Sequence, residues 1–358
     1  MDRRSFLKNS TLAGGAIATA SLATPAVAQG KKQWIAVSAF GKAGLLGQAL
    51  ESFASAVGTL SGGALTIDVY HAGELVAPFE ALDAVQAGTA QMGYGAPYYW
   101  AGKSDSISFV ACMPFGLNAQ EQNAWCYYAG GIDLADKTAY NPLGLKFLPL
   151  GNSGNQMGGW YNKDVTTLAD LQGLKFRMPG LGGEVLKSLG TNVVLLPGPD
   201  VVPAISSGTI DGTEWIGPAA DLGKGLHKVC KHYYYPGWHE PGTCLEAFIN
   251  LKYWNLLSND LKRLVEACCI KSNSLIASEF FARNSFAIKK LKDDYNVDFV
   301  KYPDDLLRSL RKKSFEVVSN YARKDEMGKK IYDNIMKFRK LYMFWSEYSE
   351  KSFLESRI

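Results

Sequence analysis

Residues 32–71 read KQWIAVSAFGKAGLLGQALESFASAVGTLSGGALTIDVYH. Residues 32–40 form an apolar run typical of a strand, and residues 64–71 alternate between apolar and polar side chains as a second strand does. Between them, residues 45–58 place apolar side chains at helical spacing along one face. A strand, a helix and another strand in succession are typical of a parallel sheet covered by helices, so this stretch predicts an α/β fold.

Two segments about 120 residues apart resemble each other. Residues 84–92 read AVQAGTAQM, and residues 204–212 read AISSGTIDG. In both, an amphipathic helix pattern ends at a glycine, the residue that commonly ends helices in the left-handed conformation, and a short strand pattern follows. We interpret the pair as a sign of two duplicated lobes. The residues just after each Gly-Thr are then expected at strand ends that face one shared cleft.

The composition is that of an ordinary globular protein. The chain has 358 residues, of which 47% are hydrophobic and 20% are charged, and its formal net charge is +4. At roughly 150 residues per domain, this length predicts about two domains that each bury a core. The net charge is small, and no basic stretch carries the interleaved aromatic side chains that stack on bases, so nucleic acid is not expected as a partner.

The N-terminus has the features of an export signal. The adjacent Arg3 and Arg4 precede an apolar run of small residues over 12–22, and residues 26–28 read AVA, a signal-peptidase motif. The run is too short to remain as a membrane span, which needs about 20 apolar residues. We expect residues 1–28 to be a twin-arginine signal peptide that sends the folded protein to the periplasm. An ordinary secretory signal with a chance arginine pair is the alternative.

The cysteines do not indicate a metal site. None forms a C-x-x-C pair, and no histidine-cysteine cluster has the spacing of zinc ligands. We therefore predict buried free thiols, although the periplasm would permit a disulfide. The six residues are Cys112, Cys126, Cys230, Cys244, Cys268 and Cys269.

The C-terminal region has long helical periodicities and many lysines. Residues 325–358 are expected to form one long helix with a broad apolar face. Such a helix either packs across both lobes or docks on a second protomer. A homodimer through this helix and packing within one chain are therefore both possible. Its apolar residues are Met327, Ile331, Ile335, Phe338, Leu341, Tyr342, Phe344, Trp345 and Tyr348.

Three charged residues lie in surroundings that suit a binding site. Arg177 ends a short strand pattern that stops at Pro179, and its planar guanidinium could hold a carboxylate through two hydrogen bonds. Glu214 lies in a nearly apolar strand, and Glu240 lies in an aromatic loop. A buried glutamate is costly unless it meets a cation or several donors. Structural salt bridges are the alternative interpretation for all three residues.

Motifs in order along nearly the whole chain resemble those of the periplasmic solute-binding subunits of tripartite ATP-independent periplasmic (TRAP) transporters, the DctP-type family. The resemblance is greatest to the branch that binds 2-oxo acids such as pyruvate. The motifs are GELV (73–76), GNSGNQMGGW (151–160), LKFRMPG (174–180), GTIDGTEWIGP (208–218) and YYYPGWHE (233–240).

The resemblance implies an α/β, two-lobed periplasmic binding protein of class II type, with a hinge and long C-terminal helices. The expected domain boundaries are residues 29–151 with about 241–280 for lobe I, 152–240 with about 281–310 for lobe II, and 311–358 for the C-terminal helices.

The resemblance also implies a metal ion that bridges substrate and protein. In the 2-oxo-acid branch its ligands are a glutamine, a glutamate and the backbone of the following tryptophan, which match Gln156, Glu214 and Trp215. Glu240 also matches the branch, as a further ligand or neighbour. An arginine in the LKFR strand holds the substrate carboxylate in this family, a role that falls on Arg177. Lining positions match Asn152 and the run Tyr98, Tyr99 and Trp100, so the expected substrate-contacting residues are Arg177, Gln156, Asn152, Trp215, Tyr99 and Trp100.

Charge independently favours the metal. In a closed cleft, Glu214, Glu240 and a substrate carboxylate would face Arg177 alone, which leaves two negative charges without a counter-charge. An oxygen-coordinated cation relieves this imbalance. Because the ligands are carboxylate, amide and backbone oxygens, we expect a hard ion, Na⁺ ahead of Ca²⁺, and no organic cofactor.

The sequence thus predicts a receptor that is not an enzyme. It would hand a small monocarboxylate to the small and large integral-membrane subunits of a TRAP transporter for uptake driven by an ion gradient. The same fold binding lactate, a dicarboxylate or another organic acid is one alternative, and a receptor that serves a sensor kinase is another. A more distant one is an exported hydrolase that uses Glu214 and Glu240 as paired carboxylates.

Overall fold

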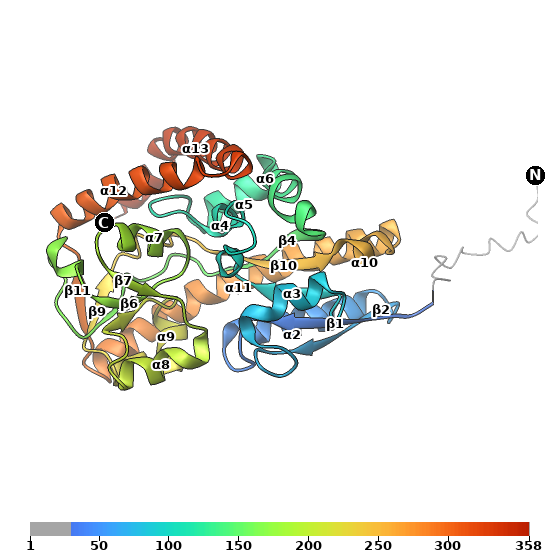
Figure 1. Ribbon diagram of the computed structural model, residues 1–358, viewed down its shortest axis with the longest axis horizontal. Helices are drawn as coiled ribbons and strands as arrows, with labels where there is room; N and C mark the ends of the chain where they lie inside the picture. Colours follow the sequence, from blue (N-terminus) through green and yellow to red (C-terminus); the bar gives the residue numbers. More distant parts are fainter. Residues whose placement is uncertain (1–29, 358) are drawn as a thin grey trace, which may run out of the picture.

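The computed structural model describes residues 30–357, so the signal peptide expected in residues 1–28 lies outside the described residues. Two β-sheets form the centres of two halves of the molecule, and helices cover both sheets (Figure 1). Figure 1 places β1, β2 and β10 in one half and β6, β7, β9 and β11 in the other. The predicted α/β class is confirmed.

The first sheet has the strand order β2-β1-β3-β10-β4. β1 runs parallel to β2 and β3, whereas β10 runs antiparallel to β3 and β4. α2 (Leu45–Leu60) connects β1 to β2 and buries an apolar face that includes Leu50 and Phe53, so the predicted strand–helix–strand unit is confirmed. The strands are β1 (Lys32–Ser38), β2 (Leu65–Tyr70), β3 (Met92–Gly95), β4 (Leu145–Asn152) and β10 (Cys244–Asn250).

The second sheet has the strand order β11-β9-β5-β8-β6-β7. β6 runs parallel to β7 and β8, β5 runs antiparallel to β8 and β9, and β11 extends the sheet parallel to β9. The strands are β5 (Gly159–Tyr161), β6 (Lys175–Arg177), β7 (Asn192–Val194), β8 (Gly212–Thr213), β9 (His232–Tyr235) and β11 (Asp298–Lys301).

The two sheets repeat one arrangement. The orders β2-β1-β3-β10-β4 and β7-β6-β8-β5-β9 match strand for strand in both position and direction. The two similar segments of the sequence lead into matching strands, β3 and β8. Each passes through a glycine in the left-handed region, Gly88 with φ 80° and Gly208 with φ 73°. The sequence similarity therefore reflects equivalent places in the two halves.

Most of the remaining elements are short. Their helices are α3 (Ala81–Gln86), α4 (Ile107–Ala111), α5 (Ala119–Tyr128), α6 (Gly131–Ala135), α7 (Gly180–Ser188), α8 (Gly198–Ser206), α9 (Pro218–Lys224) and α10 (Leu251–Asn255). The single-turn elements are η1 (Pro78–Glu80), η2 (Pro97–Trp100), η3 (Asp136–Tyr140), η4 (Asn141–Leu143), η5 (Ala169–Leu171) and η6 (Leu226–Lys228).

One long helix joins the two halves. α11 (Asn259–Asp293) contacts α2 and β4 of the first half and α9 of the second. The hydroxyl of Ser258 caps its first turn by accepting a hydrogen bond from the Leu261 N–H. Because α11 is continuous, it ties the outer faces of both halves to one rigid element.

The C-terminal helices pack across both halves (Figure 1). α12 (Asp304–Ala322) contacts α7 of the second half, and α13 (Glu326–Glu347) contacts α4, α5 and α6 of the first. The expected single helix is wrong in one respect, because it breaks at Tyr348 and Ser349 before α14 (Glu350–Ser356). Only the first part of the apolar face is buried, at Ile331 and Ile335. The exposed apolar residues of this region are Met327, Leu341, Met343, Phe344, Trp345, Tyr348, Phe353 and Leu354.

The six cysteines are buried and unpaired, as predicted. Among residues 30–357, no helix combines the length and the apolar character needed to cross a membrane.

Candidate functional site

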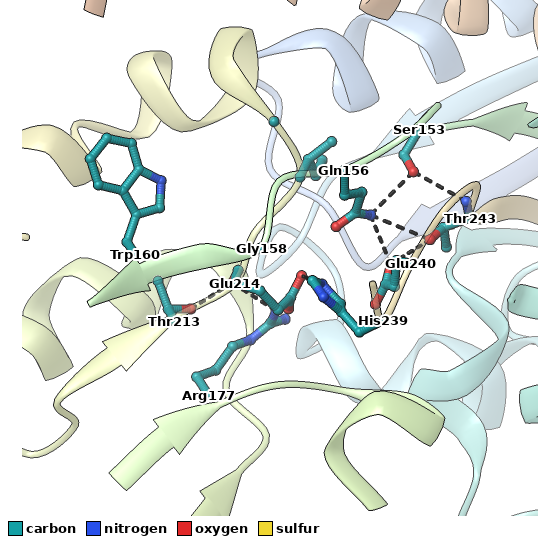
Figure 2. Close-up of polar contacts among 12 residues, drawn as sticks. Ser153, Gln156, Gly158, Trp160, Arg177, Thr213, Glu214, His239, Glu240 and Thr243 are labelled. Atoms are coloured by element: carbon teal, nitrogen blue, oxygen red, sulfur yellow. Dashed lines mark hydrogen bonds and ion pairs between the residues drawn. The ribbon is translucent and has the colours of Figure 1, made fainter. Parts of the chain in front are cut away.

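Two of the segments that pass between the two sheets lie against each other. Residues 153–158 lead from β4 to β5, and residues 236–243 lead back from β9 to β10. Gln156 of the outgoing segment donates from its backbone N–H to the Glu240 carbonyl at 3.2 Å and from its amide to the Glu240 carboxylate at 2.7 Å. Figure 2 shows this contact beside Ser153 and Thr243, which also bind the Gln156 amide.

Arg177 and Glu214 reach the same place from the second sheet. Arg177 is the last residue of β6, and Glu214 follows the last residue of the neighbouring parallel strand β8. Their side chains form an ion pair, and both are only 1% exposed. The Arg177 Nε–H also donates to the Leu196 carbonyl at 3.2 Å. Lys175, two residues earlier, is exposed. Strand alternation could not decide the burial of Arg177, because that burial comes from its position at the strand end.

The aromatic residues after β3 approach from the first sheet. β3 occupies the place in its sheet that β8 occupies in the other, so η2 and Glu214 follow equivalent strand ends. The Tyr98 hydroxyl donates to the Glu240 carboxylate at 3.3 Å. The Trp215 ring lies 5.2 Å from the Arg177 guanidinium and 3.9 Å from the Lys224 ammonium, within the range of cation–π contacts. Aromatic rings thus reach the site from both sheets.

Several buried polar atoms at this point make no hydrogen bond within residues 30–357. They are Gln156 Oε1, Arg177 Nη2, Glu214 Oε2, Glu240 Oε1 and both ring nitrogens of His239. Buried polar groups without partners are rare in folded proteins, and each one calls for an explanation. Their concentration in one place marks a site built to hold a polar ligand, an ion, or both.

The electrostatics of the site support an added positive charge. Burial raises the pKa of Glu214 to about 7, against the opposing effect of Arg177. Burial also raises the pKa of Glu240 to about 7, and the neighbouring Glu214 carboxylate adds to this effect. Two carboxyl groups that resist ionisation in the chain alone would be stabilised as carboxylates by a bound cation.

The donor set fits a metal ion. Glu214, His239 and Glu240 form the one group of three potential ligand residues in residues 30–357 whose ligand atoms all lie within 4.8 Å of one another. The free Gln156 Oε1 adds an amide oxygen beside them. Carboxylate and amide oxygens are the ligands that Na⁺ and Ca²⁺ prefer.

A small cavity of about 10 Å³, the size of a single water molecule, lies against Gln156 and Arg177 of the site. It is lined by Phe40, Leu46, Tyr98, Tyr99, Ser153, Gln156, Arg177, Trp215, Ile216, Thr243 and Leu245. A second cavity of about 730 Å³ adjoins it between α2, α9 and α11 and shares Phe40, Leu46, Trp215 and Ile216 with it. Side chains of both halves therefore separate the small site from a large groove.

Two of the residues expected at the site point elsewhere. The Asn152 amide binds Gln122 and the Gly154 N–H, and the Trp100 indole N–H donates to Glu246 at 2.6 Å. Neither residue lines the small cavity. Alternation along β4 and the tight turn of η2 direct these side chains into the core of the first half. The structure does bring together Tyr99, Gln156, Arg177, Glu214, Trp215 and Glu240.

Sequence reasoning missed Asp221 in the first turn of α9. Its carboxylate accepts hydrogen bonds from the backbone N–H groups of Ile216 and Gly217, both at 3.1 Å, and from the side chains of Trp160 and Tyr233 at 2.8 and 2.7 Å. An Asp seven residues after Glu214 matches no known binding motif. The available signal was its place three residues after Pro218, where a helix begins and an acidic side chain in the first turn is favoured.

Comparison with known proteins identifies the family. Residues 38–325 match the model of the DctP family, bacterial extracellular solute-binding protein family 7. The chain belongs to this family. The receptor is 39% identical over 303 residues to a monocarboxylate 2-oxoacid-binding periplasmic protein of Nostoc sp., covering 85% of this chain and 83% of the relative. Members of the DctP family are periplasmic solute receptors of TRAP transporters. The prediction of a receptor rather than an enzyme is therefore confirmed.

Solved structures of TRAP solute-binding proteins share the fold. One from Pseudoalteromonas atlantica T6c, with bound sodium and pyruvate, is 35% identical with a TM-score of 0.88 and covers 91% of this chain and 99% of its own. Another from Bordetella bronchiseptica RB50 is a dimer of mixed occupancy with copurified calcium and picolinate. It is 31% identical with a TM-score of 0.89 and covers 92% of this chain and 97% of its own. The two-lobed binding-protein fold is confirmed.

Proposed function

We propose that this receptor binds a small monocarboxylate of the 2-oxo-acid class, such as pyruvate, and delivers it to the integral-membrane subunits of a TRAP transporter. The observation that carries the proposal is the meeting of Arg177, Gln156, Glu214 and Glu240 at one buried point between the two sheets, each with an unpartnered polar atom. The relatives that bind 2-oxo acids support the same substrate class.

Arg177 holds the substrate carboxylate in this proposal. Its Nη2 is buried and free of hydrogen bonds within the described chain, so it can donate to a carboxylate oxygen. Tyr99 and Trp215 line the same cavity and limit the size of the group attached to the keto carbon. In this proposal Asn152 and Trp100 do not contact the substrate. They support the site by stabilising the turns in which they lie.

A bridging cation holds the other end of the substrate. The ligands we propose are Gln156, Glu214, the backbone of Trp215, and Glu240. Oxygen ligands alone favour Na⁺ or Ca²⁺, and we place Na⁺ first, as expected from the sequence. When bound, the ion would supply positive charge to offset the Glu214, Glu240 and substrate carboxylates.

Calorimetry of the purified receptor tests this function. Chelator-treated protein would be titrated with pyruvate, lactate and succinate in buffers that contain Na⁺, Ca²⁺ or neither. We expect the tightest binding for pyruvate and a marked loss of affinity without both ions. If succinate or lactate bound more tightly than pyruvate, the proposed substrate class would be wrong. Equal pyruvate affinity in all three buffers would rule out the metal bridge.

We further infer that closure of two lobes encloses the substrate. The proposed division is residues 29–151 with about 241–280, residues 152–240 with about 281–310, and the C-terminal helices from 311. The separate sheets and the two connecting segments support it. Ligand stabilises the closed form, so small-angle scattering should give a smaller radius of gyration with pyruvate than without it.

Export by the twin-arginine pathway is part of the same proposal. It is supported by Arg3 and Arg4 ahead of a short apolar run. Replacement of both arginines by lysine should leave the precursor in the cytoplasm, as followed by fractionation and immunoblotting. Normal export of that variant would assign the signal to the general secretory pathway.

We infer that the exposed apolar residues at the C-terminal end of α13 and in α14 pack against a second copy of the chain. Phe344, Trp345 and Tyr348 are each more than half exposed, a costly arrangement for a monomer in water. The related dimer from Bordetella bronchiseptica supports a homodimer of this receptor.

A further inference from the structure

Phe115 lies in an unusual turn between α4 and α5. The Gly116 N–H donates to the Met113 carbonyl at 2.8 Å, which closes a four-residue turn around Pro114 and Phe115. Phe115, the third residue of this turn, has φ 53°. A turn with proline second and a positive φ third ordinarily has glycine or asparagine in the third position, because a bulky side chain is strained there. An aromatic residue at this point therefore calls for a reason other than the turn itself.

The ring and the backbone of Phe115 both contact Trp238. The two rings stack with their centroids 5.9 Å apart and their planes inclined by 27°. The Phe115 N–H also donates to the Trp238 carbonyl at 2.8 Å. A second close approach lies nearby, since a Cβ on Gly242 would come within 2.4 Å of the Ala119 nitrogen. The turn and the start of α5 thus pack directly against the return segment, residues 236–243.

Trp238 belongs to the part of the return segment that holds Gln156. The Gly237 N–H donates to the Gln156 carbonyl at 3.1 Å, and the Gln156 N–H donates to the Glu240 carbonyl at 3.2 Å. A Cβ on Gly237 would lie 2.3 Å from the Gln156 carbonyl oxygen, so the two backbones are in close contact. A displacement of Trp238 would therefore also move Gln156 and Glu240, two of the proposed ion ligands.

The helix α13 holds Phe115 through its carbonyl group. The Arg339 Nε–H donates to the Phe115 carbonyl at 3.1 Å. The Arg339 guanidinium also lies 5.3 Å from the ring of Phe315 in α12, within the range of a cation–π contact. A hydrogen bond from a charged donor is stronger than one between neutral groups. One arginine at the junction of α12 and α13 thus fixes the backbone of the strained turn.

We propose that Phe115 is a positioning residue through which α13 sets the place of the return segment at the substrate site. Arg339 fixes the turn, and the stacked ring of Phe115 fixes Trp238. Trp238 in turn aligns Gln156 and Glu240. The strained backbone at Phe115 is retained because the ring could not otherwise meet Trp238. The proposal rests on the proposed function, because it concerns the residues that align the ligands of that site.

Two variants and a matched control test the proposal by calorimetry with pyruvate at saturating Na⁺ and Ca²⁺. Phe115→Asn removes the ring and keeps the turn, because asparagine tolerates a positive φ. Arg339→Met keeps the apolar stem of the side chain and removes its donors. Asn334→Ala is the control, because it removes another anchor of α13, the 2.7 Å hydrogen bond from the Trp125 indole, and leaves the turn untouched.

Circular dichroism and thermal unfolding would check that each variant folds. If Phe115→Asn does not fold, Phe115→Leu replaces it, since leucine keeps an apolar side chain but cannot stack on Trp238.

We expect Phe115→Asn to weaken pyruvate binding about tenfold and Arg339→Met about fivefold, whereas Asn334→Ala should change it by less than about twofold. A protein that carries both Phe115→Asn and Arg339→Met should lose no more affinity than Phe115→Asn alone, because Arg339 acts through Phe115.

Hydrogen exchange without ligand gives a second readout, which a general loss of stability does not move at temperatures well below unfolding. Mass spectrometry should show faster amide exchange in peptides that contain Gln156 or Gly237, because both amides are bonded within the segment that Phe115 supports. We expect this change in Phe115→Asn and in Arg339→Met. Asn334→Ala should exchange there at the wild-type rate.

Several outcomes would overturn the proposal. Unchanged pyruvate affinity or unchanged exchange in Phe115→Asn is one, and an equal loss of affinity in Asn334→Ala is another. Additive losses in the double variant would show that Arg339 does not act through Phe115. A wild-type protein that does not bind pyruvate would instead refute the proposed function. The exchange measurement needs no ligand, so it would still decide whether α13 positions the return segment.

Discussion

Asp221 accepts a 2.8 Å hydrogen bond from the indole N–H of Trp160. Trp160 lies in β5, and the other oxygen of the same carboxylate holds the N–H groups of Ile216 and Gly217. One side chain thus ties the segment that carries Glu214 to the middle of the second sheet. Asp221 is a positioning residue, because it contacts none of the groups that we assign to the ion or the substrate.

Asp221→Asn should weaken both the fold and the site. The asparagine NH₂ group would face the N–H of Trp160 and the O–H of Tyr233, leaving buried donors without an acceptor, at a cost of about 1–3 kcal/mol in the free energy of unfolding. Displacement of the Glu214 segment should also reduce pyruvate affinity about tenfold. Chemical denaturation and calorimetry measure the two effects. Asp200→Asn, on the exposed side of α8, is the control and should change neither.

Arg177→Lys should nearly abolish binding while the protein stays folded. Lysine keeps the charge but cannot hold Glu214 and the Leu196 carbonyl while also donating to the substrate as the guanidinium Nη2 can, so we expect about a 100-fold loss of pyruvate affinity. Arg263→Lys, at an exposed position of α11 paired with Asp260, should bind normally. Unchanged affinity in Arg177→Lys would assign the substrate carboxylate to another residue.

Glu240→Gln should separate ion binding from substrate binding. The variant keeps the size of the side chain and loses one negative ligand, so Ca²⁺ affinity should fall at least tenfold and pyruvate affinity should fall with it. Very high Ca²⁺ should restore most of the pyruvate binding. Glu355→Gln, exposed on α14, is the control. If added Ca²⁺ does not restore pyruvate affinity, Glu240 is not a ligand of the ion.

Glu246 should make the stability of the protein depend on pH. It lies buried in β10 between the Trp100 indole and the Tyr140 hydroxyl, and burial raises its pKa from an ordinary 4.5 to about 8. Between pH 5 and 8 the folded protein retains a proton that the unfolded chain releases. Stability therefore falls as pH rises, by up to about 1.4 kcal/mol per pH unit.

Glu246→Gln removes that ionisation; its amide oxygen can accept from the Trp100 indole N–H, and its NH₂ group can donate to the Tyr140 oxygen, so the constant loss of the Tyr140 O–H bond is separate from the pH dependence. Denaturant unfolding at a series of pH values should show the variant gaining stability over the wild type as pH rises from 5 to 8. Parallel pH profiles for the two proteins would contradict this assignment.

Phe344→Ser combined with Trp345→Ser should give a monomer. Both side chains are exposed on α13 beyond the part that packs on the first half, so their loss should remove contacts between copies and spare the fold. Sedimentation velocity should show a dimer for the wild type and a monomer for the variant. Ile331→Ser, which empties a buried position, should instead lower the thermal stability. A monomeric wild type would end the dimer proposal.

Much of this architecture could be predicted from residues alone. The strand–helix–strand pattern of residues 32–71 gave the class of fold, because its periodicities are strong and local. The repeated helix–glycine–strand segment indicated two equivalent halves before any pairing of strands was known. The break at Tyr348 could not be predicted, because the apolar spacing continues through it and the chain changes direction without a proline or a glycine.

The sequence predicted the site where the type and the neighbours of a residue were informative by themselves. Glu214 and Glu240 stood out as charges in apolar surroundings, a signal that depends only on the cost of burial, whereas Arg177 was singled out by its place at the end of a strand. The sequence did not show that the Trp100 indole turns toward Glu246, because both residues lie in strands or turns more than a hundred positions apart. The same holds for Asp221, whose partners come from three separate segments.

The contact between Gln156 and Glu240 has a mechanical consequence. These residues lie on two of the segments that connect the halves. In the proposed closure, a small displacement at such a connection would become a larger one at the outer edges of the two halves. An ion of slightly different radius at the proposed site would then change how far those edges approach each other, and with it the surface presented to the proposed membrane subunits.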